Sequence, residues 1–345
     1  MGLLVTGGCG FIGSHVCEHF ARLGYDVISI DDLSRQALAK SGWKLEKTVT
    51  HNWSYLSKYK NIRLLRADVT RDSDMKDVRD DVDYVIHTAA QTATTTSVED
   101  PRTDFVTNAF GTFNMLEFAR RRDAEFAYCS TNQVYGNAIN SQVRDLGRRF
   151  EPHLGNKGTS EDEPVGRGVL SPYGCSKLAG DLYVSDYSKT YGMVSASFRL
   201  SCIYGIRQFG HEEQGWIVNL IRHFLTDQEI NIYGTGKQVR DILYVSDLTR
   251  VFELFHEKRT PGTYNIGGGY ANSLSLLEFI DFLKEKYPGR RPKVTFKEER
   301  LGDKRYYVSD ISKAGETLGW HPLVPFEEGI NRVVDWVRSH IEYFM

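Results

Sequence analysis

Residues 2–13 read GLLVTGGCGFIG, a short apolar run that passes directly into a turn rich in glycine. The run has the length and composition of a buried strand, and the residues after the turn can start a helix. The turn fits the spacing GxGxxG from Gly8 and GxxGxxG from Gly7. Glycine at these points permits a tight turn and lets the backbone approach a pyrophosphate at the positive end of a helix. This stretch predicts a dinucleotide-binding unit.

The rest of the first half alternates short apolar runs with helix-like stretches. Strands are predicted at 26–30, 62–66, 83–87 and 125–130, and helices at 13–23, 103–121 and 172–191. Such alternation is typical of a parallel sheet covered by helices on both faces, with ligands at the carboxyl ends of the strands. The predicted fold class is therefore α/β: a Rossmann-type doubly wound parallel sheet with a smaller C-terminal substrate-binding lobe.

The pattern changes near residue 200, where polar loops that contain glycine become frequent. We predict a cofactor-binding domain over 1–199, to which 241–263 returns, and a substrate lobe over 200–240 and 264–345 with helices at 275–287 and 326–339. Two stretches, 34–61 and 137–170, read as long irregular loops. Because the second joins two candidate catalytic elements, we expect it to act as a lid.

The bulk composition narrows the class of protein. The chain has 345 residues with 43 basic and 45 acidic side chains, a formal net charge of -2. A nearly neutral chain does not favour nucleic acid or a membrane surface as partner. The five cysteines are scattered without a CxxC pair, so neither a disulfide framework nor a metal site is expected. With a strand predicted from residue 2 and no long apolar run, we expect a cytoplasmic protein.

Acidic residues follow the second and third predicted strands. Asp31 and Asp32 can accept hydrogen bonds from adenosine ribose hydroxyls and would repel a 2′-phosphate, so NAD is preferred to NADP. Asp68 is placed to meet the adenine edge. The predicted cofactor-binding residues are Gly7, Gly10, Phe11, Ile12, Gly13, Asp31, Asp32, Ser34, Asp68, Val69, Ala89, Ala90, Gln91, Asn108, Tyr173 and Lys177.

The segment Ser171-Pro172-Tyr173-Gly174-Cys175-Ser176-Lys177 contains Tyr-x-x-x-Lys, which places Tyr173 and Lys177 on one face of a helix. A lysine ammonium and the positive charge of oxidised nicotinamide would draw the tyrosine pKa from about 10 toward neutrality. Such a tyrosine can take a proton from an alcohol while hydride leaves the same carbon. Ser130 and Thr131 end the preceding strand, where a hydroxyl can bond the reacting oxygen.

The glycine turn, the acid after the second strand, the strand-end hydroxyl and Tyr-x-x-x-Lys occur in the order that the extended short-chain dehydrogenase/reductase family has. The chain resembles this family over essentially its whole length, and the resemblance gives the catalytic roles to Thr131, Tyr173 and Lys177. Further strings resemble its CDP-paratose 2-epimerase (CDP-tyvelose epimerase) branch; they are STNQVYG at 130–136, SPYGCSK at 171–177, YGIRQF at 204–209, EQGW at 213–216 and GTGKQVRD at 234–241. This implies inversion at C2 of a CDP-hexose, CDP-paratose or CDP-glucose, with tightly bound NAD.

Asn132 and Gln133 bear on the type of reaction. Sugar-nucleotide 4,6-dehydratases of this family have two carboxyl residues here, which carry the protons of water elimination. Amides cannot act as general acid or base at neutral pH, so dehydration is not expected. Epimerisation through a keto-sugar remains, with a UDP-glucose 4-epimerase-type enzyme, or a reductase or dehydrogenase with exchangeable NAD(P)H, as alternatives.

The sugar nucleotide needs small polar groups and cations. The threonine-rich loop after the fourth strand offers hydroxyls for the sugar, and the resemblance assigns arginines to the phosphates, where bidentate contact suits them. The predicted substrate-binding residues are Thr95, Thr96, Ser97, Thr131, Asn132, Gln133, Arg207, Gln208, Gln214, Arg240 and Arg305. In such enzymes the helices at 103–121 and 172–191 commonly pair, so we expect a homodimer or homotetramer.

Overall fold

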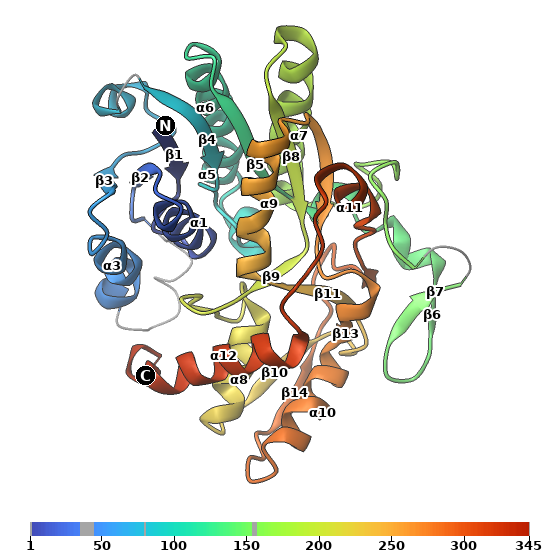
Figure 1. Cartoon of the computed structure of the whole chain (residues 1–345). Coiled ribbons are helices and arrows are strands. Elements are labelled where there is room, and N and C mark those ends of the chain that lie inside the picture. The colour runs from blue at the N-terminus through green and yellow to red at the C-terminus, as the bar shows by residue number, and fades with distance from the viewer. Residues whose placement is uncertain (1, 35–44, 79–80, 154–156, 345) are drawn as a thin grey trace.

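A seven-stranded, wholly parallel sheet runs through the upper part of the molecule (Figure 1). The computed structural model describes residues 2–34, 45–78, 81–153 and 157–344. The strands, in their spatial order, are β3 (Ile62–Arg66), β2 (Asp26–Asp31), β1 (Gly2–Thr6), β4 (Val82–His87), β5 (Glu125–Thr131), β8 (Ser195–Leu200) and β12 (Gly262–Ile266). The predicted fold class and the first five strands are confirmed, with ends that differ by at most one residue.

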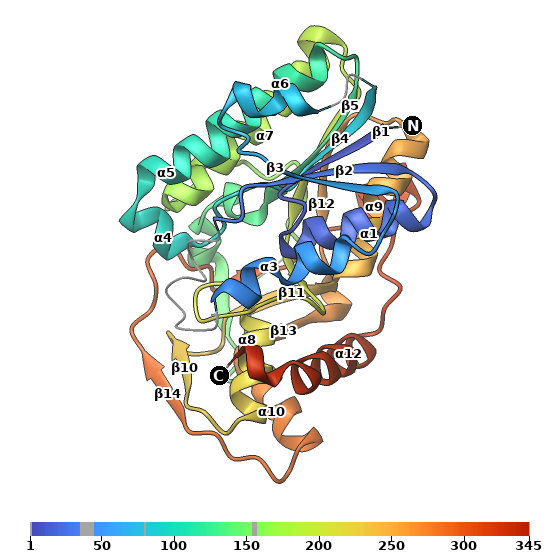
Figure 2. The ribbon, with the colours of Figure 1, turned by 90° about the vertical axis from the view of Figure 1, so that its left-hand side faces the viewer.

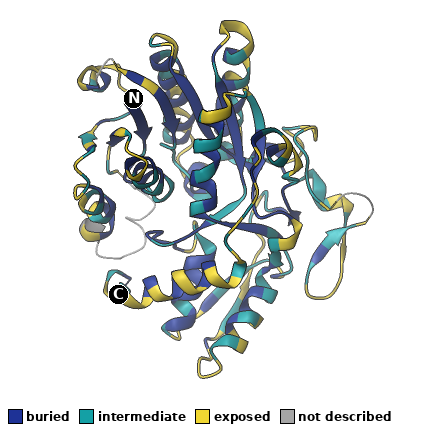
Figure 3. Ribbon diagram, viewed as in Figure 1, coloured by how far each residue is buried: buried dark blue, intermediate teal, exposed yellow. Residues whose placement is uncertain are grey.

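The strand order reverses between β1 and β4, since the chain first extends the sheet toward β3 and then returns to the other side of β1. Open parallel sheets bind ligands at such a reversal, beyond the carboxyl ends of the strands. Strands β1, β5 and β8 are buried along their whole length, as helices on both faces require (Figure 3). This geometry brings the residues that follow β1, β4 and β5 to one edge.

Helices form a layer on each face of the sheet (Figure 2). One layer contains α1 (Phe11–Arg22), α3 (Leu45–Leu56), α9 (Val245–Lys258) and α11 (Ser312–Leu318). The other contains α4 (Thr94–Glu99), α5 (Pro101–Phe105), α6 (Gly111–Arg120) and α7 (Ser171–Tyr191). A 3-10 turn at Asp72–Asp77 precedes β4.

The structure corrects the prediction of an irregular stretch at 34–61 and refines the predicted helix at 103–121, which is present. The stretch 34–61 is not irregular throughout, because α3 occupies Leu45–Leu56; residues 35–44 lie outside the described part of the chain. The helix predicted at 103–121 is α5 and α6 joined by a π-helical turn at Val106–Phe110. Such a turn inserts one extra residue into the helix, which sequence periodicity does not reveal.

The second lobe lies below the sheet in Figure 1 and has its own hydrophobic core. Its elements are β9 (Cys202–Tyr204), α8 (Trp216–Leu225), β10 (Ile230–Tyr233), β11 (Val239–Tyr244), β13 (Ser273–Ser275), α10 (Leu276–Lys286), β14 (Val294–Lys297), β15 (Tyr306–Tyr307) and α12 (Phe326–Ser339), with short 3-10 turns at Tyr270–Asn272 and Ile341–Tyr343. The boundary predicted at 263/264 falls inside β12, a strand of the large sheet. No helix of the described residues is long and apolar enough to cross a membrane.

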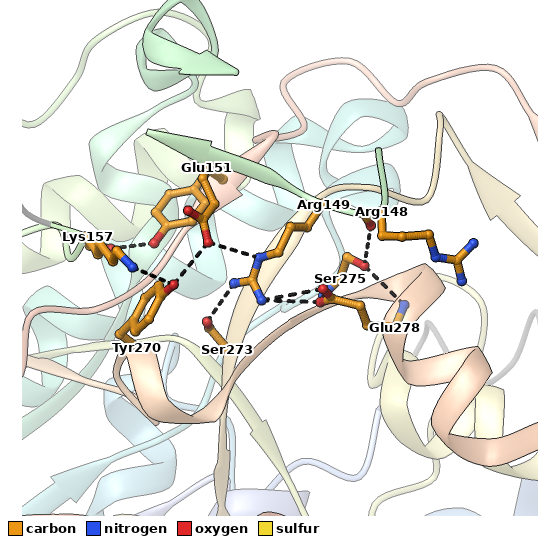
Figure 4. A network of polar contacts seen from close by, with 9 residues as sticks. Arg148, Arg149, Glu151, Lys157, Tyr270, Ser273, Ser275 and Glu278 are labelled. Carbon is orange, nitrogen blue, oxygen red and sulfur yellow. Dashed lines mark hydrogen bonds and ion pairs between the residues drawn. The ribbon is translucent and has the colours of Figure 1, made fainter. Parts of the chain in front are cut away.

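The stretch 137–170 is not an unstructured loop. After 3-10 turns at Asn132–Tyr135 and Ala138–Gln142 it forms a hairpin from β6 (Val143–Asp145) and β7 (Phe150–Pro152). Arg149 of this hairpin donates a hydrogen bond to Ser273 Oγ at 2.9 Å and forms ion pairs with Glu151 and Glu278 (Figure 4). The hairpin is therefore bonded to the second lobe, and a lid function remains a prediction.

A buried ion pair fixes α7 to the sheet. Asp181 on α7 is 1% exposed and accepts two hydrogen bonds from Arg199 of β8, at 3.0 and 3.2 Å. Ser130 and Ser197 each donate a further hydrogen bond to it at 2.7 Å. Arg199 continues the network by donating to the Tyr135 hydroxyl at 2.9 Å. Removal of either Asp181 or Arg199 would leave the charge of the other buried without its counter-ion.

We expect Arg199→Met to lower the free energy of unfolding by about 3–5 kcal/mol, because it leaves the Asp181 carboxylate buried without its cation. Arg120→Met is the matched control, since Arg120 and Glu117 form an ion pair near the surface of α6. The control should cost at most about 1 kcal/mol. Urea unfolding of both variants measures the difference, and equal midpoints would contradict the role given to the buried pair.

Candidate active site

The glycine turn packs backbone against backbone. Gly7 has φ +63°, and a Cβ added there would lie 2.7 Å from the Cα of Ala89, which follows β4. A Cβ on Gly13 would lie 2.2 Å from the Gly7 carbonyl oxygen. Ala89 also donates its amide to Thr6 Oγ1 at 3.2 Å. The structure thus brings the predicted cofactor residues Gly7, Gly13 and Ala89 together, and half-buried Ala90 follows directly.

Helix α1 presents an open N-terminus beside this turn. The helix starts at Phe11 after Gly10, no side chain in the described part of the chain caps it, and its first turn contains no acidic residue. The amides of Phe11, Ile12 and Gly13 are among the first N–H groups of the helix, which have no acceptor within it. The helix dipole makes this end positive. The combination fits a pyrophosphate, which such helix ends bind.

Only one of the two acids after β2 reaches the turn. Asp31 is buried and accepts hydrogen bonds from the Cys9 amide at 2.9 Å and the Leu33 amide at 2.8 Å. Asp32 is exposed and accepts from the amide and hydroxyl of Ser34 at 3.0 and 2.9 Å, which forms a small turn at the surface. Asp31 is therefore the acid that the fold holds at the glycine turn.

Sequence reasoning missed Asn52, which supports the turn from the other side. Its side-chain amide on α3 is buried and donates to the carbonyl oxygens of Cys9 and Gly10, both at 3.1 Å. These contacts tie α3 to the start of α1. The only local signal is an asparagine in a stretch that was predicted to be irregular, so the contact could not be found from the sequence.

The residues after β3 lie in a turn of their own. Asp68 accepts hydrogen bonds from the amide and hydroxyl of Thr70 at 2.9 and 2.8 Å, and its carboxylate lies 3.5 Å from Arg71. Val69 is buried against Gly111, where an added Cβ would lie 2.8 Å from Val69 Cγ2. The contact positions this turn at the start of α6.

A polar network connects the loop after β4 with α7. Asn108, in the π-helical turn, donates to the Gln91 carbonyl oxygen at 2.9 Å, to Asp104 at 3.0 Å and to Ser176 Oγ at 3.1 Å, and accepts from the Gln91 amide at 2.8 Å. Ser176 donates to the other Asp104 oxygen at 2.6 Å. Burial raises the pKa of Asp104, which these hydrogen bonds partly oppose. Asn108 in the π-helical turn therefore faces both the Gln91 backbone and α7. Asp104 and Ser176 were not among the predicted site residues.

The structure distinguishes the two candidate hydroxyls at the end of β5. The Thr131 side chain acts on Tyr173 and lowers the pKa of that tyrosine, whereas Ser130 is held by Asp181 in the buried ion-pair network. Ser97, from the threonine-rich loop, accepts a hydrogen bond from the Tyr173 amide at 3.1 Å and so fixes the start of α7. Thr131 is therefore the hydroxyl that lies with Tyr173.

The electrostatics of the pair differ from the sequence-based expectation. Burial raises the pKa of Tyr173 to about 12, although the Thr131 hydrogen bond opposes the shift. Burial also lowers the pKa of Lys177 to about 8, against the attraction of Asp104 and Asp181. The Lys177 ammonium lies 4.1 Å from the centre of the Tyr128 ring. The groups of the protein alone therefore do not lower the pKa of Tyr173 toward neutrality, because desolvation has the largest effect. The other positive charge in the sequence-based expectation belongs to the cofactor.

The two amides after Thr131 face a lysine that was not predicted. Lys304 donates to Asn132 Oδ1 at 3.0 Å and to Gln133 Oε1 at 2.6 Å. Lys304 comes from the second lobe, so this contact joins the lobes beside the catalytic residues. Its neighbour Arg305, which was predicted, is exposed instead and lies 5.6 Å from the centre of the Phe150 ring.

The other predicted substrate residues are dispersed. Arg240 pairs with Asp303 at 2.5 Å, close to Lys304. Arg207 is buried, pairs with Glu18 of α1 at 2.7 Å and lies over the Tyr55 ring, which places it beside the cofactor helix.

The predicted substrate residues with hydroxyl or amide side chains differ in how exposed they are. Gln214 is exposed and pairs through its backbone with His211, whereas Gln208 is buried and donates weakly to the Ile203 carbonyl oxygen at 3.4 Å. Thr96 donates to Glu213 at 3.4 Å. Among the described residues, Thr95 Oγ1 and Gln208 Oε1 are buried without a hydrogen-bond partner, as atoms that bind a ligand would be.

Comparison with known proteins agrees with this geometry. The model of the NAD dependent epimerase/dehydratase family matches residues 3–267. The CDP-paratose 2-epimerase of Salmonella typhi is 34% identical over 98% of this chain and 100% of its own. The crystal structure of UDP-glucuronic acid 4-epimerase from Bacillus cereus, in complex with UDP-glucuronic acid and NAD, superposes with a TM-score of 0.83 at 28% identity over 99% of this chain and 100% of that one.

A second solved structure, UDP-glucose 4-epimerase from Thermotoga maritima with UDP-glucose, gives a TM-score of 0.81 at 30% identity over 99% of this chain and 100% of that chain. The sheet order, the glycine turn, the Thr131–Tyr173 contact and these matches agree with one another. The chain belongs to the NAD dependent epimerase/dehydratase family, within the extended short-chain dehydrogenases/reductases, and NAD is its cofactor.

Proposed function

We propose that this protein is a nucleotide-sugar epimerase that inverts C2 of a CDP-hexose, of the CDP-paratose or CDP-glucose type. The alcohol is oxidised to a keto-sugar, which reorients and receives the hydride on its other face. The observation that carries the reaction type is the pair of amides after Thr131, Asn132 and Gln133, which are both bonded to Lys304 where an elimination would need two acids.

Each residue of the site has a role in moving one proton. Thr131 orients the Tyr173 hydroxyl, and Tyr173 takes the proton of the sugar hydroxyl and later returns it. NAD, when bound, supplies the hydride acceptor, and its positive nicotinamide favours the phenolate. Lys177 lies one helical turn from Tyr173, and its ammonium also favours the phenolate. Because burial raises the pKa of Tyr173 to about 12, the residue is protonated until such positive charge is close.

Asn132 and Gln133 support epimerisation rather than dehydration. Both amide oxygens accept hydrogen bonds from Lys304, so neither side chain resembles the acid–base pair that eliminating water requires. A reductase with exchangeable cofactor would share these residues. Tight retention of NAD is favoured by the support that the glycine turn receives from Asp31 on one side and Asn52 on the other.

The nucleotide and the carbon are the finer part of the proposal. The Salmonella typhi relative named for the CDP-paratose reaction supports both, as do the sequence strings shared with that branch. The two solved structures contain UDP-sugars, so a UDP-glucose 4-epimerase-type activity is the second candidate. A cytoplasmic location also stays a prediction.

The decisive experiment incubates the purified protein with CDP-paratose, CDP-glucose or UDP-glucose in D2O without added NAD. We expect NMR to show an epimer at C2 of a CDP-sugar, with the ring hydrogen undeuterated, because hydride returns from the bound cofactor. Deuterium at the inverted carbon would contradict the hydride mechanism. Turnover of UDP-glucose alone would contradict the CDP-sugar assignment, and a need for added cofactor would indicate a reductase.

We expect Tyr173→Phe to lower kcat by about 100-fold to 10,000-fold while NAD stays bound, because it removes the group that moves the proton. Thr131→Val should lower kcat less, by loss of one orienting hydrogen bond. Tyr191→Phe, at the exposed end of the same helix, is the control and should retain the parental rate. Steady-state kinetics, with absorbance of bound cofactor, measure all three; an unchanged rate in Tyr173→Phe would exclude this residue as the base.

We further propose that two copies pair through α5, α6 and α7. An apolar surface supports this pairing; its exposed residues are Val98, Phe105, Val106, Phe110, Phe113, Leu182 and Tyr183. The Phe113 ring contacts those of Phe110 and Tyr183, and exposed apolar side chains gathered in this way mark an interaction site. Phe105 is 59% exposed and Leu182 is 56% exposed, so both are suited to substitution without loss of core packing.

The double variant Phe105→Glu/Leu182→Glu should sediment as a monomer, because charge on the apolar surface opposes its burial. Leu323→Glu, an equally exposed leucine of the second lobe at 54%, should leave the assembly unchanged. Analytical ultracentrifugation of the parent and both variants decides. A parent protein that is itself monomeric would contradict the pairing.

A further inference from the structure

Lys304 is a buried lysine at the junction of the two lobes, and the epimerase mechanism does not use it. Its side chain is 1% exposed, and its Nζ lies 3.0 Å from Asn132 Oδ1 and 2.6 Å from Gln133 Oε1. Among the described residues these amide oxygens are the only hydrogen-bond acceptors of the Nζ. Both belong to the residues that directly follow Thr131.

The ammonium determines how both amides are turned. A protonated lysine can only donate hydrogen bonds, so each amide must direct its carbonyl oxygen toward it. The other end of Asn132 is occupied, because its Nδ2 donates to the Leu200 carbonyl oxygen at 3.2 Å. For Gln133, no acceptor of Nε2 is present in the described part of the chain. Its side chain therefore has one uncommitted end, and that end is a donor.

Gln133 lies beside the catalytic tyrosine. Its amide N–H donates to Thr131 Oγ1 at 3.3 Å. A Cβ added to Gly174, the residue after Tyr173, would lie 3.5 Å from Gln133 Cβ. Gln133 is half-buried, so a ligand held against Tyr173 can reach it.

The backbone on both sides of Lys304 is held by Asn140, which belongs to the stretch 137–170, and by Arg240. Asn140 donates to the Asp303 carbonyl oxygen at 2.8 Å and accepts from the Arg305 amide at 2.6 Å. Asp303 Oδ1 accepts from the Lys304 amide at 2.9 Å and from Arg240 at 2.5 Å. The direction of the lysine side chain is thus set by contacts from two other segments.

We propose that Lys304 is a positioning residue that fixes the Gln133 amide so that its NH2 group, and not its oxygen, faces the sugar beside the carbon that is oxidised. The inference rests on the proposed function and names a determinant of its specificity. A carbonyl oxygen can only accept hydrogen bonds. An amide donor at this place therefore stabilises the keto-sugar, whereas an amide oxygen would repel it.

The protonation of Lys304 gives this arrangement a pH dependence. Burial, assisted by the positive charge of Arg240, lowers the pKa of Lys304 to about 7, and Asp303 and Cys202 act in the opposite direction. The Tyr307 ring, 5.7 Å from the Nζ, is the other neighbour. Below this pKa the ammonium fixes both amides. As the pH rises through it, the neutral amine can accept as well as donate, and Gln133 is free to turn over.

Three variants separate the donor from the charge. Lys304→Met removes both, Lys304→Arg keeps a donor at every accessible pH, and Gln133→Glu keeps an acceptor toward Lys304 but removes the NH2 group. Lys286→Met, on the surface of the same lobe over the Phe282 ring, is the control for loss of a positive charge. Thermal unfolding and the absorbance of bound NAD verify that each variant is folded and loaded.

We expect Lys304→Met and Gln133→Glu to lower kcat about tenfold to a hundredfold, with a smaller change in KM, because the lost donor acts on the keto-sugar. In the parent, kcat/KM should fall as the pH rises through about 7. Lys304→Arg should keep its activity to higher pH, and Lys286→Met should match the parent. A readout without turnover is the NMR signal of the Gln133 side-chain NH2, assigned by its loss in Gln133→Glu, which should titrate in the parent and not in Lys304→Arg.

Parental kcat in both Lys304→Met and Gln133→Glu would overturn this inference alone, since the parent would still epimerise. A Gln133 signal that does not respond to pH would overturn it as well. If Lys304→Met does not fold, Gln133→Glu and Lys304→Arg decide between the same outcomes. A parent that converts none of the three nucleotide sugars would overturn the proposed function and this inference together.

Discussion

A single buried carboxylate holds the catalytic helix in place. Asp181 lies one helical turn after Lys177 and two turns after Tyr173, so the three residues share one face of α7. Asp181 is bonded to Arg199 and to serines of β5 and β8. These bonds fix the rotation of α7 about its own axis and its distance from the sheet. With that rotation Tyr173 meets Thr131 at the end of β5, and Lys177 lies over the Tyr128 ring. The chemistry of the site depends on a contact that takes no part in it.

The features predicted correctly are those that local sequence encodes. The strands, the glycine turn and the Tyr-x-x-x-Lys helix follow from short-range patterns, and α12 has the predicted bounds. Helix α3 was missed because its sequence, LEKTVTHNWSYL, is rich in polar and β-branched residues and has a weak helical signal. Asn52 and Lys304 were missed because their partners lie more than forty and more than 170 residues away, and nothing local marks such contacts. The pKa of Tyr173 was misjudged because burial is a property of the fold.

The insertion connects regions that the sequence separates. Its hairpin is bonded to β13 and α10 through Arg149, while Asn140 holds the segment that carries Lys304. Farther along, Thr159 pairs with the chain after β15, and its carbonyl oxygen accepts from Asn265 at the end of β12. The stretch 137–170 therefore connects the end of β12 with the segment that carries Lys304.

The position of β12 in the sequence limits where the chain can be divided into fragments. It pairs with β8 along Gly262–Ile266, after the chain has left the sheet and built much of the second lobe. A fragment that ends before residue 200 would leave the β8 edge unpaired, and unpaired edges promote association between chains. A chimaera that exchanges substrate lobes between relatives therefore needs at least three crossover points, before β9, after β11 and after β12, because the second lobe also takes up chain beyond β12. The sheet is therefore complete only when the chain reaches Ile266, after β9, α8, β10 and β11 of the second lobe and before the rest of that lobe.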